Sequence, residues 1–238
     1  MAEGKDGYDK KMEDRTKLSR TPRQSSPTKN VDIIADVSVK KRICDIIIDL
    51  HECIQNWEIV NQSSFQTINT LVNLSAQKQS SEEEYERDSS SVSLECWKRY
   101  KSKLINIREG LISDHVNNMK RIKSLYLKVK KTVNNLEAIY HMKSSPCPGH
   151  DLDGAEGDKA VFNTWTSEDF YRSARSIFNC YTKEWLLKQQ MSEHFLGIEP
   201  KTEASQTALF VSMWLHQPYI DDSCSSALES MLLESGIK

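Results

Sequence analysis

The fold of this chain is decided by one stretch, residues 94–140, which reads LECWKRYKSKLINIREGLISDHVNNMKRIKSLYLKVKKTVNNLEAIY. Its large side chains recur at steps of three and four, the spacing that places them on one face of an α-helix. We call this face the seam; it comprises Leu94, Trp97, Tyr100, Leu104, Ile107, Leu111, His115, Met119, Ile122, Tyr126, Val129, Val133, Leu136 and Tyr140. A helix of this length spans roughly 70 Å, more than the core of a small globular domain. We therefore expect part of the seam to meet another helix.

The expected mate for this helix lies upstream, within residues 31–75. Apolar side chains recur there at helical spacing, namely Ile43, Ile47, Leu50, Ile54, Trp57, Phe65, Ile68 and Val72. Asn61 falls on the same stripe, where it either fixes the register of the two helices or lies at the edge of their contact. Residues 76–92 (AQKQSSEEEYERDSSSV) are rich in Ser and Glu and lack periodicity, so they predict a mobile loop. Residues 31–143 thus predict a long antiparallel helical hairpin of the coiled-coil type.

The N-terminal residues 1–30 hold almost no large apolar side chain and carry both charges, which predicts a disordered tail. Two sites in this tail suit proline-directed kinases, Thr21 before Pro22 and Ser26 in the run Ser-Pro-Thr-Lys. Phosphate would add about two negative charges to a basic segment. We take Thr21 and Ser26 as phosphorylation candidates, with chance occurrence in a basic tail as the equal alternative.

A second group of helices is predicted after a linker. Residues 144–160 are rich in Pro and Gly and separate the hairpin from a small C-terminal helical unit, residues 161–238. The first helix of this unit has a cap-like start at residues 166–169 and is stopped by Gly197 and Pro200. A further helix begins after Thr202 or Ser205 and ends at His216 or Gln217, before Pro218. The last helix spans residues 223–235, with a cap within residues 221–223 and an end at Gly236. The predicted fold class is therefore all-α.

Charge is uneven along the chain although the net charge is only −2. Residues 95–143 carry twelve Lys and Arg against four acidic residues, and two basic runs, 120–123 and 128–131, stand out. Such runs could contact the phosphate backbone of RNA or DNA. A solvated face, or one paired with acidic residues, is the favoured alternative because no aromatic side chains are interleaved on it.

The sequence holds no nucleotide-binding or hydrolase motif, so we predict no enzyme, no catalytic residue and no cofactor. The six cysteines and six histidines are dispersed, and the cluster Cys147, His150, Asp151 and Asp153 lacks a second ligand group, so no metal site is predicted. The cysteine spacing suits reduced thiols in an intracellular protein. No apolar run approaches the roughly 18 residues of a membrane span, and we expect a soluble protein.

Three stretches resemble one known family. These stretches are VSMWLHQPYI at 211–220 with LESMLLESG at 228–236, FNTW at 162–165 with Phe170-Tyr171 and KEWLLK at 183–188, and WEIVNQSSFQTINTLVNL at 57–74. They resemble the cyclin-dependent kinase 2-interacting protein family over most of the chain beyond residue 40. The long N-terminal tail and the more basic central helix depart from the family pattern.

The resemblance implies a nuclear, non-enzymatic adaptor, with a cytoplasmic pool left open. Implied partners are cyclin-dependent kinase 2 with its cyclins, the kinase that fires replication origins, and the ATR-interacting protein of DNA-damage checkpoint signalling. The resemblance also implies membership of an AAA-ATPase assembly, with a second coiled-coil subunit, in replisome protein turnover and maturation of the large ribosomal subunit. Self-association stays open. As partner-binding residues we predict Leu104, Ile107, Leu111, Met119, Ile122, Val129, Val133, Trp214, Tyr219 and Leu232.

Overall fold

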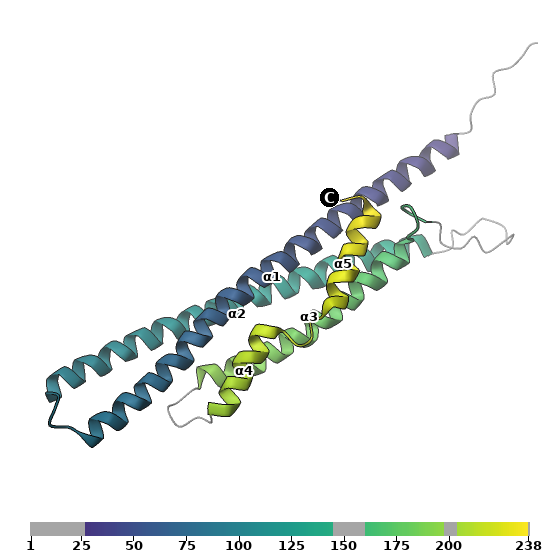
Figure 1. Ribbon diagram of the computed structural model, residues 1–238. Coiled ribbons are helices and arrows are strands. Elements are labelled where there is room, and N and C mark those ends of the chain that lie inside the picture. The colour runs from purple at the N-terminus through teal and green to yellow at the C-terminus, as the bar shows by residue number, and fades with distance from the viewer. Residues whose placement is uncertain (1–26, 145–159, 198–203, 238) are drawn as a thin grey trace, which may run out of the picture.

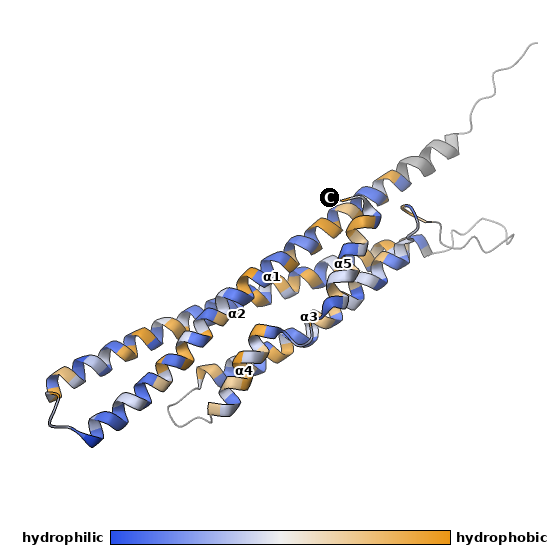
Figure 2. Cartoon of the chain, in the orientation of Figure 1, coloured by the Kyte–Doolittle hydropathy of each residue, from blue (hydrophilic) through white to orange (hydrophobic). Residues whose placement is uncertain are grey.

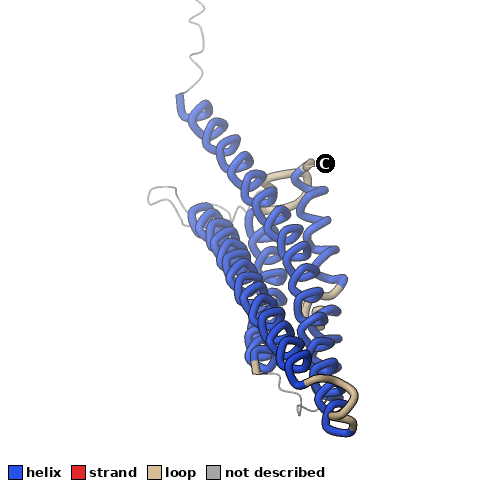
Figure 3. Tube along the Cα trace, turned by 90° about the vertical axis from the view of Figure 1, so that its left-hand side faces the viewer, coloured by secondary structure: helices blue, strands red, loops and turns tan. Residues whose placement is uncertain are grey.

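The computed structural model describes residues 27–144, 160–197 and 204–237, and within these ranges the secondary structure is entirely helical (Figures 1 and 3). The five helices are α1 (Pro27–Arg87), α2 (Leu94–Ser144), α3 (Ser167–Leu196), α4 (Ala204–His216) and α5 (Asp222–Ser235). The predicted all-α class is confirmed. No helix in these ranges is both long enough and apolar enough to cross a membrane.

The first two helices form the predicted antiparallel hairpin, and α1 and α2 pack along each other (Figure 1). Apolar positions from both helices are buried in one core, including Ile47 and Leu50 of α1 and Ile122 and Val129 of α2. The three-four spacing of the seam explains this arrangement, because it lines one face of α2 with side chains that the mate can cover.

The loop predicted at residues 76–92 is wrong over most of its length, since α1 continues to Arg87 and only residues 88–93 turn the chain. Ala, Gln, Lys and Glu fill residues 76–79 and 82–84, and these are good helix formers even without an apolar stripe. Their side chains also pair. Gln79 Nε2 donates to Glu83 Oε1 at 3.1 Å, and Glu82 forms an ion pair with Lys101 of α2 at 3.0 Å.

Helices α3, α4 and α5 pack onto the hairpin. Helix α3 lies against α2, and α4 and α5 lie one after the other between α3 and α1 (Figures 1 and 3). The result is an up-down-up-down four-helix bundle whose fourth position is shared by two short helices. All five helices place a fully buried side chain in the same core, namely Trp57, Ile122, Phe170, Trp214 and Met231. The C-terminal unit therefore completes the core of the hairpin.

The predicted caps of the C-terminal helices are confirmed. Thr166 begins α3 with a capping box, in which its hydroxyl accepts from the Asp169 N–H while the Asp169 carboxylate accepts from the Thr166 N–H. Gly197 ends that helix. Asp221 caps the start of α5, and Gly236 ends it with φ +73°, the left-handed conformation that glycine adopts without steric cost.

Two further predictions concern segments at the edge of the described residues. Residues 27–30, placed in the predicted tail, belong to the first turn of α1, which suits Pro27 because proline is tolerated where helix N–H groups lack partners. Thr21, Ser26 and the rest of residues 1–26 lie outside the described residues. Residues 145–159, which include nearly all of the predicted linker, lie outside them as well.

Candidate protein-interaction site

Half of the predicted partner-binding residues lie in the core of the chain itself. The buried ones are Leu104, Ile122, Val129, Val133 and Trp214. Helix α1 covers the seam of α2 from one side and α3 covers α2 from another, which encloses Ile122, Val129 and Val133. Leu104 is buried nearer the hairpin turn, and Trp214 of α4 packs against His115 and Phe195. In this structure they stabilise the fold.

The other five predicted residues keep part of their surface open. Ile107 is 41% exposed and Tyr219 is 45% exposed, whereas Leu111, Met119 and Leu232 are half-buried. Ile107 lies on α2 toward the hairpin turn, and Tyr219 lies in the break between α4 and α5. The five residues thus come from three segments, namely α2, the break between α4 and α5, and α5.

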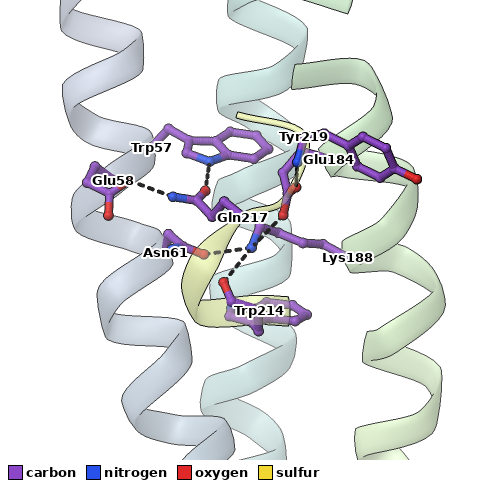
Figure 4. Close-up of polar contacts among 8 residues, drawn as sticks. All are labelled: Trp57, Glu58, Asn61, Glu184, Lys188, Trp214, Gln217 and Tyr219. Carbon is purple, nitrogen blue, oxygen red and sulfur yellow. Dashed lines mark hydrogen bonds and ion pairs between the residues drawn. The ribbon is translucent and has the colours of Figure 1, made fainter. Parts of the chain in front are cut away.

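A buried polar cluster joins the segments that carry the family resemblance (Figure 4). Helix α1 contributes Trp57, Glu58 and Asn61, α3 contributes Glu184 and Lys188, α4 contributes Trp214, and the break after α4 contributes Gln217 and Tyr219. The contacts cross up to 160 residues of sequence. The motif WLHQPY thus marks a structural junction between helices.

Lys188 is the centre of this cluster and is fully buried. Its ammonium donates to Asn61 Oδ1 at 2.7 Å and to the Trp214 carbonyl at 3.1 Å, and it pairs with Glu184 Oε1 at 3.1 Å. Lys188 Nζ also lies 4.5 Å from the centroid of the Trp214 ring, within cation–π range. Burial lowers the pKa of Lys188 to about 8, although the Glu184 carboxylate opposes this shift. Lys188 therefore ties the C-terminal carbonyl of α4 to both α1 and α3.

Gln217 holds the chain where α4 stops. Its φ of +45° is in the left-handed region that non-glycine residues rarely adopt. The side chain compensates through two bonds at 2.7 Å: Trp57 Nε1 donates to Gln217 Oε1, and Gln217 Nε2 donates to Glu58 Oε2. Pro218 follows and cannot continue the helix. The turn that redirects the chain into α5 is thus held by tertiary contacts.

His115 is a second buried polar group beside this cluster. Its Nε2 lies 2.8 Å from Ser192 Oγ, and its ring packs against Phe195 and Trp214. Burial lowers the pKa of His115 to about 4, so the imidazole is neutral near pH 7. His115 is one of the seam positions, and in the structure its side chain is buried in the core.

Sequence reasoning identified Asn61 but missed its partner. Lysine is usually exposed, and 127 residues separate Asn61 from Lys188. A signal was nevertheless present, because Lys188 lies seven residues after Tyr181 and four after Glu184, on the buried face of α3. The edge interpretation of Asn61 is wrong, since the residue is 1% exposed. The hydrogen bond between Lys188 and Asn61 fixes α3 to α1. The register interpretation concerns a different pair of helices, α1 and α2.

The end of the hairpin projects beyond the other helices (Figure 1). At the end of α3, Arg108 Nη2 of α2 donates to the carbonyl of Leu196 at 3.4 Å. Residues 76–107 form the end of the hairpin beyond this contact, and we call them the arm. The acidic part of α1 in the arm is strongly hydrophilic (Figure 2). Exposed apolar side chains lie nearby at Val92, Leu94, Ile105 and Ile107. These four side chains offer apolar contacts on an otherwise charged segment.

Comparison with known proteins finds relatives that share one name. No family model matches the chain. A human protein is 28% identical over 94% of this chain and 98% of its own length, and a bovine protein is 27% identical over the same shares. A Xenopus laevis protein is 26% identical over 82% of this chain and 88% of its own length. Each is called cyclin-dependent kinase 2-interacting protein.

The chain is similar to the cyclin-dependent kinase 2-interacting proteins. The similarity runs along nearly the whole length of the human and bovine relatives, so it covers the bundle as a whole. Within the part of the chain that the structure describes, no three His, Cys, Asp or Glu side chains gather in a way that could hold a metal ion.

Proposed function

We propose that this chain is a non-enzymatic adaptor that binds cyclin-dependent kinase 2 in complex with a cyclin. The observation that carries the proposal is the match, over 82–94% of the chain, to relatives named for interaction with that kinase. The fold supports an adaptor role, because the bundle buries its core with its own helices and leaves the arm uncovered on its outer sides.

The arm is the proposed contact surface for the kinase complex. Ile105 and Ile107 are 48% and 41% exposed on α2, past the end of α3. Ile105 and Ile107 are two positions apart on a helix, so their side chains point about 200° apart around α2 and lie on opposite sides of the arm. A partner can pack against either side, and burying one such side chain contributes about 1.5–3 kcal/mol.

The direct test is the affinity for purified cyclin-dependent kinase 2 with its cyclin, measured by surface plasmon resonance on the full chain. We expect Ile105→Asp with Ile107→Asp to weaken binding by at least about tenfold, because two apolar contacts are replaced by charges. The matched control is Leu127→Asp, since Leu127 is 50% exposed on the same helix but lies alongside the bundle.

Two results would count against different parts of the proposal. No binding by the unmodified chain would overturn the kinase-adaptor function. Binding that the arm variant and the Leu127→Asp control leave equally intact would retain the function and remove the arm from it.

We further propose the wider adaptor role that the resemblance implies. In that role the chain connects the kinase that fires replication origins, the ATR-interacting protein, and an AAA-ATPase assembly with a second coiled-coil subunit. It acts in the nucleus, in replisome protein turnover and large ribosomal subunit maturation. Affinity purification from nuclei should recover ATPase subunits with the unmodified chain and fewer with the arm variant. Recovery of none of these subunits would contradict the wider role.

The alternative proposal is direct nucleic-acid binding through the basic face of α2. The observation that favours it is the exposure of six basic side chains, those of Lys120, Arg121, Lys123, Lys128, Lys130 and Lys131. Retention on DNA and RNA across a salt series separates this class from the adaptor. A steep loss with salt, together with unchanged retention of the arm variant, would favour nucleic acid.

A further inference from the structure

The arm carries a pocket between the last turns of α1 and the first turns of α2. Its volume is about 310 Å³, enough to receive a long side chain. The lining residues are Ser81, Glu84, Tyr85, Asp88, Ser91, Val92, Cys96, Trp97 and Tyr100. Because neither α3 nor α4 reaches this end of the hairpin, the pocket lies where an incoming polypeptide can enter it (Figures 1 and 3).

One wall of the pocket is a stack of aromatic rings. The centroids of Tyr85 and Trp97 are 4.5 Å apart with nearly parallel planes, and Tyr100 follows at 5.6 Å from Trp97. Ser81 Oγ lies 3.0 Å from the Tyr100 hydroxyl, which also accepts from Gln77 Nε2 at 3.4 Å. These contacts join the two helices and hold the rings in place before any ligand arrives, which reduces the entropy cost of binding.

The charged groups that line the pocket are both acidic. Glu84 and Asp88 lie one helical turn apart, and no Lys or Arg is among the lining residues. The Asp88 carboxylate accepts from Ser90 Oγ at 2.7 Å, and hydrogen bonds from Ser90 and Ser91 lower the pKa of Asp88, so it is ionised near pH 7. The pocket therefore combines an apolar wall with negative charge.

Lys101, the cation of the arm that lies over Trp97, is engaged elsewhere. Lys101 Nζ forms an ion pair with Glu82 Oε1 at 3.0 Å and lies 5.6 Å from the centroid of the Trp97 ring. In the described part of the chain, neither Glu84 nor Asp88 forms an ion pair. The two carboxylates are thus left to attract a cation from outside.

We propose that this pocket binds an arginine side chain presented by a partner polypeptide. The aliphatic stem would pack on the rings of Tyr85 and Trp97, and the guanidinium would bond to the carboxylates of Glu84 and Asp88. Arginine suits the site better than lysine, because its planar, weakly hydrated head offers five donors to carboxylates and packs well against aromatic rings. The inference concerns an arginine-bearing segment of any partner and does not depend on the kinase being that partner.

The test observes Trp97 directly in the full chain. Five tryptophans, labelled with fluorotryptophan, give five fluorine NMR signals, and Trp97→Phe assigns one of them to Trp97. The probe is the capped tripeptide acetyl-Leu-Arg-Leu-amide, and the matched neutral probe carries citrulline in place of arginine. We expect the arginine peptide to shift the Trp97 signal saturably while the other four signals stay unchanged.

Variants that neutralise Glu84 and Asp88 then test whether these carboxylates bind the arginine side chain. Glu84→Gln with Asp88→Asn should weaken binding of the arginine peptide by about two- to thirtyfold, because two exposed ion pairs are lost. The charge-matched control is Glu109→Gln with Asp114→Asn, two exposed acids of α2 outside the pocket. Circular dichroism should show unchanged helix content and melting for both double variants.

Three results would overturn the proposal. The first is an equal shift with the citrulline peptide, which would indicate a purely apolar groove. The second is an equal loss of binding in both double variants, which would indicate a nonspecific effect of net charge. The third is the absence of a saturable Trp97 shift up to about 10 mM peptide, an affinity too weak for even one anchoring side chain.

Discussion

At the scale of single residues, the core depends on polar side chains that bond to one another inside it. Lys188, Asn61 and Gln217 join three helices through bonds of 2.7–3.1 Å, and Lys188 and Asn61 are at most 1% exposed. Removing one member of such a set leaves a buried charge without its partner, and this costs more than the bond itself contributes.

Asn61→Leu should therefore lower the free energy of unfolding by about 2–4 kcal/mol, because it removes an acceptor from the buried Lys188 ammonium. The control is Asn56→Leu, since Asn56 is exposed on the same helix and should change stability by less than about 0.5 kcal/mol. Urea unfolding followed by circular dichroism measures both variants. Equal stabilities of the two would contradict the role given to Lys188.

His115 should make the protein sensitive to acid. Its pKa of about 4 in the folded state lies below the ordinary value of 6.5, so the unfolded chain binds a proton first as the pH falls. Stability from this group is therefore present above pH 6.5 and is lost progressively between pH 6.5 and 4, up to about 3 kcal/mol. His115→Gln should flatten this part of the stability curve, whereas His216→Gln at an exposed position should leave it unchanged. A slope that survives His115→Gln would show that other groups cause it.

At the scale of elements, capping residues in the sequence predict most helix ends of the C-terminal unit. They do not predict where the hairpin turns. Thr166, Gly197, Asp221 and Gly236 act as predicted, because each cap bonds within a few residues of its own helix. The stretch 76–87 lacks the apolar periodicity that marks a helix, and its helical state depends on composition and on pairing with α2. Apolar periodicity alone therefore fails to predict that such segments are helical.

Two glycines should respond in opposite directions to alanine. Gly110 lies in α2, and a Cβ placed there meets no atom within 4 Å, so Gly110→Ala should stabilise the chain by about 0.5–1 kcal/mol. Gly236 has equal space but a φ of +73°, so Gly236→Ala should destabilise it by about 1 kcal/mol. Thermal and urea unfolding of both variants, compared with the unmodified chain, measure the difference. Stabilisation by both would show that the C-terminal cap is unimportant.

At the scale of the whole molecule, the chain is one bundle with an arm. The cluster of Figure 4 joins α1, α3 and the end of α4, so the C-terminal helices and the hairpin share one core. This explains why so much of the seam is unavailable to partners. The part of the adaptor proposal that the structure supports is accordingly the arm, where only two helices pack.

Hydrogen exchange should separate the arm from the bundle. Backbone amides in residues 76–87 and 94–104 should exchange at a lower opening free energy than those of residues 57–71 and 177–192, since only two helices bury them. Exchange followed by mass spectrometry on the full chain provides the measurement. Adding the cyclin-dependent kinase 2 complex should slow exchange in the arm if the proposed surface is correct. Uniform protection along α1 would contradict a separate arm.

The sequence by itself determined the helical class, the hairpin, and the caps of α3 and α5, because periodicity and capping act over a few residues. The tertiary structure alone decided which apolar residues stay accessible, since burial depends on helices that are distant in sequence. It also decided the pairing of Lys188 with Asn61 and the left-handed turn at Gln217. Both depend on contacts that form only when α1, α3 and α4 meet, and no local pattern encodes that meeting.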